Sequence, residues 1–216
     1  MDKFFLVYDD PCADKNYKLA KEKLKTISRV DTISGIHASH QYCASQSLTF
    51  RFMVLDADCE LLESFSYNKL LDSLTNERKV FVCRAINPVN NLVYGHGGLK
   101  IFDKRLFGNN NSVDMSTGFD IVPLDYVSNI HKFNTTPFHA WRTAFRECVK
   151  LSSGIIKNRN SKEDEYRLTH WCETFNDTLY VDFVKKGALA GREYGHKNEK
   201  LENINNFKWL KGRFES

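Results

Sequence analysis

Short apolar runs alternate with amphipathic segments along the first part of the chain. Residues 3–8, 27–30 and 48–55 carry short runs of apolar, β-branched and aromatic side chains, which predict strands buried in a sheet. Residues 14–25 and 36–45 lie between them and have the mixed apolar and polar spacing of surface helices. This alternation predicts an α/β fold with parallel strands joined by right-handed crossovers.

Acidic side chains follow these strands where each would leave the sheet. Asp9, Asp31, Asp56 and Asp58 come just after the three predicted strands. Parallel α/β sheets bind ligands at the carboxyl ends of their strands, so these carboxylates are expected to share one edge. Asp56 and Asp58 form an Asp-x-Asp pair, and Mg²⁺ and Mn²⁺ prefer carboxylate oxygens. The pair predicts a divalent cation that bridges the protein to a diphosphate; the alternative is a solvated turn.

A segment rich in Asn and Gly follows a further predicted strand at residues 80–83. Residues 87–98 combine amides, adjacent glycines and a histidine, and Lys100 lies close behind them. This composition predicts a loop that holds sugar hydroxyls, and a β-hairpin with glycine at positive φ is equally compatible with it. The sequence lacks the P-loop, HExxH, GxSxG, protein-kinase and GxGxxG signatures, which argues against those enzyme classes.

The last third of the chain has helical periodicity. Residues 138–151 place apolar side chains at helical offsets behind a proline, which predicts a helix. Residues 163–172 and 178–189 are further helical candidates, and the tail from Gly191 is basic and polar. The sequence therefore predicts a helical C-terminal part.

The composition limits the class of protein. The chain has 216 residues, of which 42% are hydrophobic and 27% charged, which suits one packed domain spanning 1–216 and excludes a mainly disordered chain. A formal net charge of +4 permits contact with nucleic acid without requiring it. No apolar run approaches the roughly 18 residues of a membrane-spanning helix, so a soluble, unexported protein without membrane contact is expected. The six scattered cysteines predict reduced thiols in a cytoplasm.

Several segments, taken in order, resemble a family of small GT-A-type glycosyltransferases carried by tailed bacteriophages, including T-even-like phages with modified DNA. The segments are FFLVYDDP, VLDADCE, INPVNNLVYGHGGLKIF, FNTTPFHAWRTAFRECVKL and ALAGREYG, and they span positions 4 to 195. The resemblance implies a GT-A-like, Rossmann-type and mostly parallel sheet flanked by helices. It also implies a nucleotide-binding half at about residues 1–100 and an acceptor-binding helical half at about 101–216.

The resemblance further implies an activity and a cellular setting. The expected reaction is metal-dependent transfer of a sugar, such as arabinose or glucose, from a UDP-sugar to 5-hydroxymethylcytosine in double-stranded phage DNA. The expected location is the cytoplasm of the infected bacterial host. Two alternatives stay open: a glycosyltransferase that acts on a protein or carbohydrate acceptor, and a non-catalytic module that binds a nucleotide-sugar or DNA. The sequence predicts neither the anomeric outcome nor the oligomeric state.

The resemblance assigns roles to particular residues. Asp56 and Asp58 would bind Mn²⁺ or Mg²⁺ and the diphosphate, and His196 would complete the metal shell. Asp114 is the candidate base that takes the acceptor proton if the reaction inverts the anomeric centre. The remaining donor contacts would be Tyr8, Asp9 and Asp31 on the nucleoside, Gly97, Gly98 and Lys100 on the sugar side, and Arg192 on the diphosphate.

Overall fold

The chain folds into two compact units. The structure, a computed structural model, describes residues 1–31, 35–107, 119–155, 161–198 and 200–216. The first unit comprises Met1–Asn87 and Val93–Lys132, and the second comprises Pro88–Leu92 and Phe133–Ser216. The expected division into a nucleotide-binding and an acceptor-binding half near residue 100 stays a prediction, and the main passage from one compact unit to the other follows Lys132.

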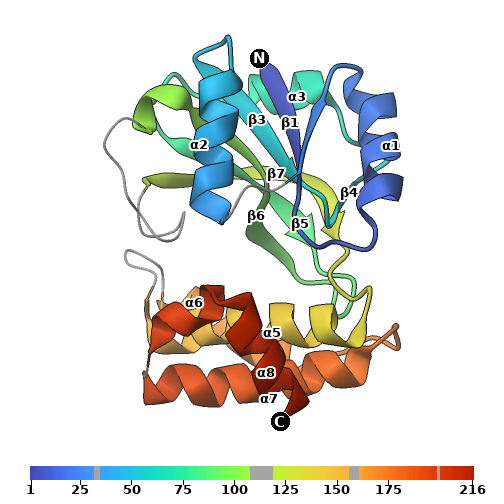
Figure 1. Cartoon of the computed structure of the whole chain (residues 1–216), viewed down its shortest axis with the longest axis vertical. Coiled ribbons are helices and arrows are strands. Elements are labelled where there is room, and N and C mark those ends of the chain that lie inside the picture. Colours follow the sequence, from blue (N-terminus) through green and yellow to red (C-terminus); the bar gives the residue numbers. More distant parts are fainter. Residues whose placement is uncertain (32–34, 108–118, 156–160, 199) are drawn as a thin grey trace. The chain divides into compact units, whose positions relative to one another are not determined.

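The first unit begins with the predicted alternation of strands and helices (Figure 1). The third strand starts at Arg51 rather than at residue 48, because Leu48 and Phe50 lie in solvent, with exposed fractions of 91% and 64%. The five elements are β1 (Asp2–Val7), α1 (Ala13–Leu24), β2 (Ser28–Asp31), α2 (Ile36–Gln46) and β3 (Arg51–Asp56).

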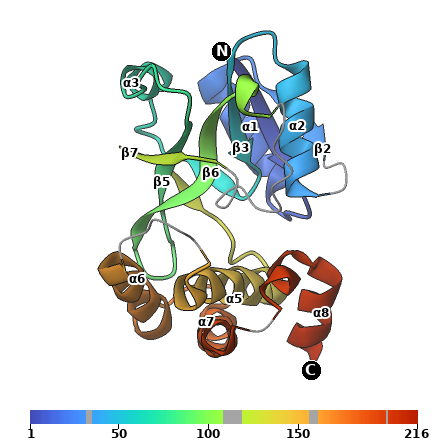
Figure 2. The same ribbon diagram turned by 90° about the vertical axis from the view of Figure 1, so that its left-hand side faces the viewer.

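The remainder of the first unit extends the sheet. Within the described residues the sheet has seven strands in the order β2-β1-β3-β6-β5-β7-β4. Figure 2 shows β2 and β7 toward opposite sides of this sheet. The added elements are β4 (Cys59–Leu61), α3 (Tyr67–Asp72), β5 (Val80–Ile86), β6 (Val93–Asp103), a 3₁₀ turn (Lys104–Leu106) and β7 (Ile121–His131).

The α/β architecture is confirmed, but the sheet is mixed rather than mostly parallel. β1 pairs in parallel with β2 and β3, and β5 pairs in parallel with β7. β6 runs antiparallel to both β3 and β5, and β4 runs antiparallel to β7. The physical reason is the β5–β6 hairpin, in which Ile86 pairs with Val93, because a short connection can join only antiparallel strands.

Helices cover both faces of the sheet around β1 and β3. On one face Phe5 and Met53 pack with Leu24 of α1 and Leu70 of α3. On the other face Phe4 and Phe52 pack with Cys43 of α2. Because successive strand residues point to opposite faces, strands with apolar side chains at nearly every position can bury both faces.

The second unit contains the predicted C-terminal helical part, and four helices are described in it. Its centre is α5, whose Trp141 and Phe145 rings stack with centroids 4.8 Å apart. Tyr194 of α7 and Leu210 of α8 belong to the same apolar cluster. The helices are α5 (Pro137–Ser153), α6 (Ser161–Glu173), α7 (Val181–Lys197) and α8 (Phe207–Glu215), with a 3₁₀ turn at Leu201–Asn205.

Glycines spaced four apart let α7 pack directly on α5. A Cβ atom built on Gly187 would lie 2.3 Å from the carbonyl oxygen of Trp141, and one on Gly191 would lie 2.3 Å from that of Phe145. A Cβ on Gly195 would lie 2.8 Å from the carbonyl oxygen of Val149. The three glycines therefore form one contact face along α7, and helix packing accounts for the two glycines of the ALAGREYG segment.

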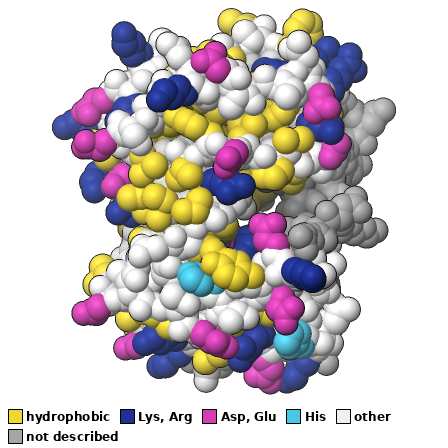
Figure 3. Space-filling view, turned by 180° about the vertical axis from the view of Figure 1, so that it is seen from behind, with side chains coloured by type: hydrophobic (Ala, Val, Ile, Leu, Met, Phe, Trp, Pro, Cys, Tyr) yellow, Lys and Arg dark blue, Asp and Glu magenta, His cyan; other side chains and the backbone are white. Residues whose placement is uncertain are grey.

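The surface of the first unit combines charged and apolar side chains. Apolar side chains gather on the face of this unit seen in Figure 3, with acidic and basic side chains among them. None of the helices in the described part of the chain is long and apolar enough to cross a membrane.

The glycine packing predicts opposite effects for two Gly→Ala substitutions. Gly191→Ala should destabilise the protein by about 2 kcal/mol, because its methyl group would collide with the α5 backbone. Gly212→Ala in α8 should be neutral or stabilise by up to about 1 kcal/mol, because no atom lies within 4 Å of its added Cβ and alanine favours the helix. Urea unfolding of the two variants measures the difference, and equal midpoints would contradict the packing described.

Candidate functional site

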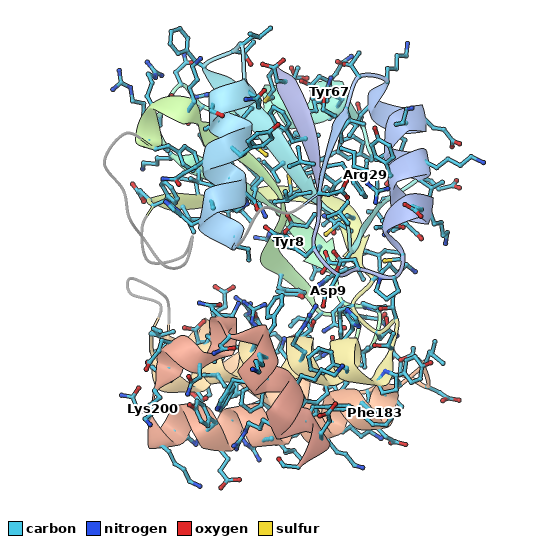
Figure 4. The ribbon with its side chains drawn as sticks, viewed as in Figure 1. Tyr8, Asp9, Arg29, Tyr67, Phe183 and Lys200 are labelled. Atoms are coloured by element: carbon cyan, nitrogen blue, oxygen red, sulfur yellow. The ribbon has the colours of Figure 1, made fainter. Side chains whose placement is uncertain are left out.

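The carboxyl ends of the parallel strands bring acidic side chains together. In the sheet Leu6 pairs with Asp56 and Val7 pairs with Asp31. Tyr8 and Asp9, which follow β1 directly, therefore lie at the same edge, and both are labelled in Figure 4. The strand register therefore places the ends of β1, β2 and β3 at one edge of the sheet, as the sequence predicted.

Asp56 is held by an ion pair inside this edge. Nζ of Lys100 donates to both carboxylate oxygens of Asp56, at 2.8 Å to Oδ1 and 2.7 Å to Oδ2. Val54 pairs with Lys100 across β3 and β6, so Lys100 shares the face on which Val54 and Asp56 lie. The Lys100 side chain is only 5% exposed and that of Asp56 is 20% exposed. The two charges are thus largely withdrawn from water and depend on each other.

Burial changes the ionisation of the groups around this pair. It raises the pKa of Asp56 to about 6, against the opposing effect of the Lys100 ammonium. Burial, and then the Asp56 carboxylate, raises the pKa of Tyr8 above its usual value. Burial, and then Lys100, holds the pKa of His40 well below its usual value. Within the described residues, Tyr8 Oη and His40 Nε2 are buried without a hydrogen-bond partner, close to the Asp56–Lys100 pair.

Asp58 lies in a different environment from Asp56. It follows β3 in the short turn that leads into β4, and its side chain is 25% exposed. Its Oδ2 lies 2.9 Å from Nε2 of His131, whose Nδ1 lies 3.0 Å from the hydroxyl of Tyr94. Asp58 and Asp56 are thus similarly exposed and differ in their partners, because Lys100 contacts Asp56 and a line of buried side chains contacts Asp58.

Asp9 and Asp31 are more exposed than this pair. Both side chains lie in solvent at the strand ends. Asp31 forms an ion pair with Arg29 at 3.1 Å, and Arg29 also reaches Asp14 at 2.5 Å. Their predicted contact with a nucleoside stays a prediction, and their position at the ends of β1 and β2 is compatible with it.

The Asn- and Gly-rich segment forms a hairpin and most of a long strand. Gly97 has φ 83° and lies in β6, next to the buried Gly98. The hairpin alternative is confirmed, and the loop expected over residues 87–98 ends at Val93, because residues 93–95 pair with β5. Lys100, which follows this segment in β6, contacts Asp56 at the acidic edge of the sheet.

Three predicted site residues do not belong to the described part of this edge. Arg192 is half-buried in α7 of the second unit, near the thiols of Cys148 and Cys172. His196 lies near the end of α7 and is exposed. Asp114 lies outside the described residues.

The residues at the edge suit a divalent cation that is shared with a substrate. No group of three or more His, Cys, Asp or Glu side chains among the described residues could hold a metal ion by itself. Mg²⁺ and Mn²⁺ are commonly held by one or two carboxylates together with substrate phosphates and water. Asp58, with Asp56 beside it, provides such an incomplete oxygen set, which a diphosphate would complete.

Sequence reasoning missed His131 and Tyr94. The seven histidines show no metal-binding spacing, and nothing near position 131 singles one of them out. His131 becomes a neighbour of Asp58 through the antiparallel pairing of β4 with β7, which joins Cys59 to His131. The only signal in the sequence was that residues 121–131 form an extended, partly apolar run with a histidine at its end.

Comparison with known proteins gives distant similarities in structure. The mannosyltransferase PcManGT from Pyrobaculum calidifontis, solved with GDP-Man and Mn²⁺, matches 99% of this chain and 81% of its own, with 10% identity and a TM-score of 0.47. TarS from S. aureus matches 99% of this chain and 80% of its own, with 10% identity and a TM-score of 0.37. The inositol-1-phosphate CTP transferase from T. maritima matches 58% of this chain and 66% of its own, with 11% identity and a TM-score of 0.35.

No family model and no curated protein matches the chain. The resemblance to phage glycosyltransferases therefore rests on the ordered sequence segments, and a function has to be argued from the chain's own residues.

The buried ion pair predicts a pH-dependent loss of stability in Lys100→Met. At pH 8 the variant should lose about 3 kcal/mol, because the Asp56 carboxylate stays buried without its counter-charge. At pH 5 the loss should be smaller, because Asp56 has a folded-state pKa of about 6 even beside Lys100 and takes up a proton there. The pKa of Asp56 is higher in the folded than in the unfolded state. The destabilisation by its buried charge is therefore complete above the folded-state pKa and decreases as the pH falls through that pKa.

Urea unfolding at the two pH values measures this loss. The matched control is the double variant Lys100→Met with Asp56→Asn, which leaves no buried charge and should recover most of the stability at both pH values. A Lys100→Met loss that is equal at pH 5 and pH 8 would show that the charge of Asp56 is not its cause.

Proposed function

We propose that the protein is a metal-dependent glycosyltransferase that moves a sugar from a UDP-sugar to an acceptor hydroxyl. One observation carries the proposal: Asp58 reaches solvent at the carboxyl edge of β1 and β3, beside the buried Asp56–Lys100 pair. Ligands of α/β sheets bind at this edge, and a carboxylate with a nearby cation suits a diphosphate and its divalent ion.

The two carboxylates have different parts in this proposal. Lys100 already neutralises Asp56, so Asp58 is the main protein ligand of the cation and Asp56 is its supporting neighbour. A bound Mn²⁺ or Mg²⁺ supplies Lewis-acid stabilisation of the charge on the departing nucleoside diphosphate. The proposed contacts of the chain are Tyr8, Asp9 and Asp31 with the nucleoside, Gly97, Gly98 and Lys100 on the sugar side, Arg192 with the diphosphate, His196 with the metal, and Asp114 with the acceptor proton.

We further propose that the acceptor is the hydroxymethyl group of hydroxymethylcytosine in phage DNA, with arabinose or glucose as the transferred sugar. The ordered sequence segments support this acceptor, and a net charge of +4 is compatible with binding a polyanion. A base in a duplex has to leave the stack before its substituent can react, which costs a few kcal/mol.

The test incubates the full chain with Mn²⁺ or Mg²⁺, a panel of UDP-sugars and duplex DNA that contains hydroxymethylcytosine. Nucleosides released from the DNA are then analysed by mass. A pentose or hexose increment that requires both the metal and the hydroxymethyl group is the expected result. Release of UDP without an increment would move the acceptor to a protein or a carbohydrate, and donor binding without any release of UDP would indicate a non-catalytic module.

Asp58→Asn should reduce turnover at least about 100-fold, because it removes the charged ligand of a cation whose effect on the transition state is worth several kcal/mol. The matched control is Asp125→Asn, which changes an exposed carboxylate of β7 in the same unit and should leave turnover unchanged. Initial rates of UDP release at saturating donor measure both. Full activity of Asp58→Asn would remove Asp58 from the proposed site.

A further inference from the structure

His131 holds the accessible carboxylate of the candidate site. Its Nε2 lies 2.9 Å from Oδ2 of Asp58, and its side chain is only 3% exposed. On the other side of the ring, Nδ1 lies 3.0 Å from the hydroxyl of Tyr94, which is also buried. The three side chains form a continuous line of hydrogen bonds from the interior of the first unit to a carboxylate at its surface.

The topology of the sheet builds this line from segments that are distant in sequence. β4 pairs antiparallel with β7, and Cys59 is the partner of His131 in this ladder. The backbone N–H of Lys132 donates to the carbonyl oxygen of Asp58 at 2.6 Å, so the backbone fixes the two residues together as well. Tyr94 comes from β6, the strand that also supplies Lys100 to Asp56.

A neutral His131 ring can form both contacts as hydrogen bonds when its hydrogen lies on Nε2. With the Tyr94 hydroxyl donating to Nδ1, the ring hydrogen lies on Nε2 and is donated to Asp58. Asp58 is then the acceptor of the hydrogen bond from the ring. Because the ring is fixed at both nitrogens, the carboxylate it contacts loses rotational freedom in χ1 and χ2.

We propose that His131, oriented by Tyr94, is a positioning residue that aims the Asp58 carboxylate at the divalent cation of the donor diphosphate. This inference rests on the proposed function and assigns His131 a role that the sequence did not indicate. A buried histidine with a purely structural role would affect stability and leave the affinity of Asp58 for a cation unchanged. Cation affinity therefore separates the two roles.

The experiment measures Mn²⁺ binding to the full chain in the presence of UDP, by electron paramagnetic resonance of the free ion. His131→Ala should raise the Kd for Mn²⁺ by about 10- to 100-fold, as is typical when a partner that orients a metal ligand is lost. His131→Gln keeps an amide that can donate to Asp58 and should recover most of the affinity. Tyr94→Phe should weaken binding in the same direction by a smaller factor, because the ring remains but is held at one nitrogen only.

Two further variants complete the comparison. Asp58→Asn should lose Mn²⁺ binding. His170→Gln is the matched control, because His170 also hydrogen-bonds through Nε2, to the carbonyl oxygen of Asn90 in the second unit, and its loss should leave the Kd unchanged. Circular dichroism tests whether each variant is folded. If His131→Ala does not fold, the Kd values of His131→Gln and Tyr94→Phe test the positioning role.

The outcomes separate this inference from the proposed function. If Asp58→Asn abolishes binding while the His131 and Tyr94 variants retain the wild-type Kd, the positioning role is overturned and the proposed function stands. If the wild-type chain binds no Mn²⁺ with UDP, the metal-dependent function fails and the positioning role fails with it. A raised Kd in His131→Ala that His131→Gln restores supports both.

Discussion

The ion pair between Lys100 and Asp56 is the interaction on which the carboxyl edge of the sheet depends. A carboxylate at the end of a buried strand is costly unless an opposite charge neutralises it. The required cation comes from β6, which can supply it only because it lies antiparallel beside β3 with Lys100 opposite Val54. The β5–β6 hairpin therefore stabilises the acidic end of β3, because it places Lys100 where its charge compensates the buried Asp56 carboxylate.

This constraint gives the two carboxylates of one short motif different properties. Asp56 points to the α2 face, where burial raises its pKa and Lys100 contacts both of its oxygens. Asp58 lies beyond the strand end and is contacted from the β7 side by His131 rather than by a lysine. One carboxylate therefore has a buried ammonium as its partner, and the other has a buried histidine. The Asp-x-Asp spacing alone could not distinguish them, because both residues are acidic and both follow a strand.

The sequence predicted local structure well where one pattern dominates. The apolar runs of β1 and β3 and the periodicity of α5 correspond to observed elements, since burial on two faces or on one helical stripe leaves a direct trace in the sequence. β6 was predicted only as part of the hairpin alternative, because its glycines and polar residues have the composition of a loop and only pairing with β3 and β5 makes it a strand. The contact of His131 with Asp58 depends on the β4–β7 ladder, and no local pattern encodes a pairing between segments about 70 residues apart.

The helical unit shows how a motif can be explained without a ligand. In ALAGREYG and the glycine before it, the spacing of Gly187, Gly191 and Gly195 is that of residues one helical turn apart, and each meets the α5 backbone. Close packing thus accounts for the glycines, and they give no independent indication of a diphosphate site at Arg192. Packing alone does not explain the carboxyl edge of the first unit, where buried polar atoms of Tyr8 and His40 lie near a charged pair. Apolar side chains could fill the same volume without the cost of burying charged and unpaired polar groups, so folding of the sheet is not by itself the reason for this layer.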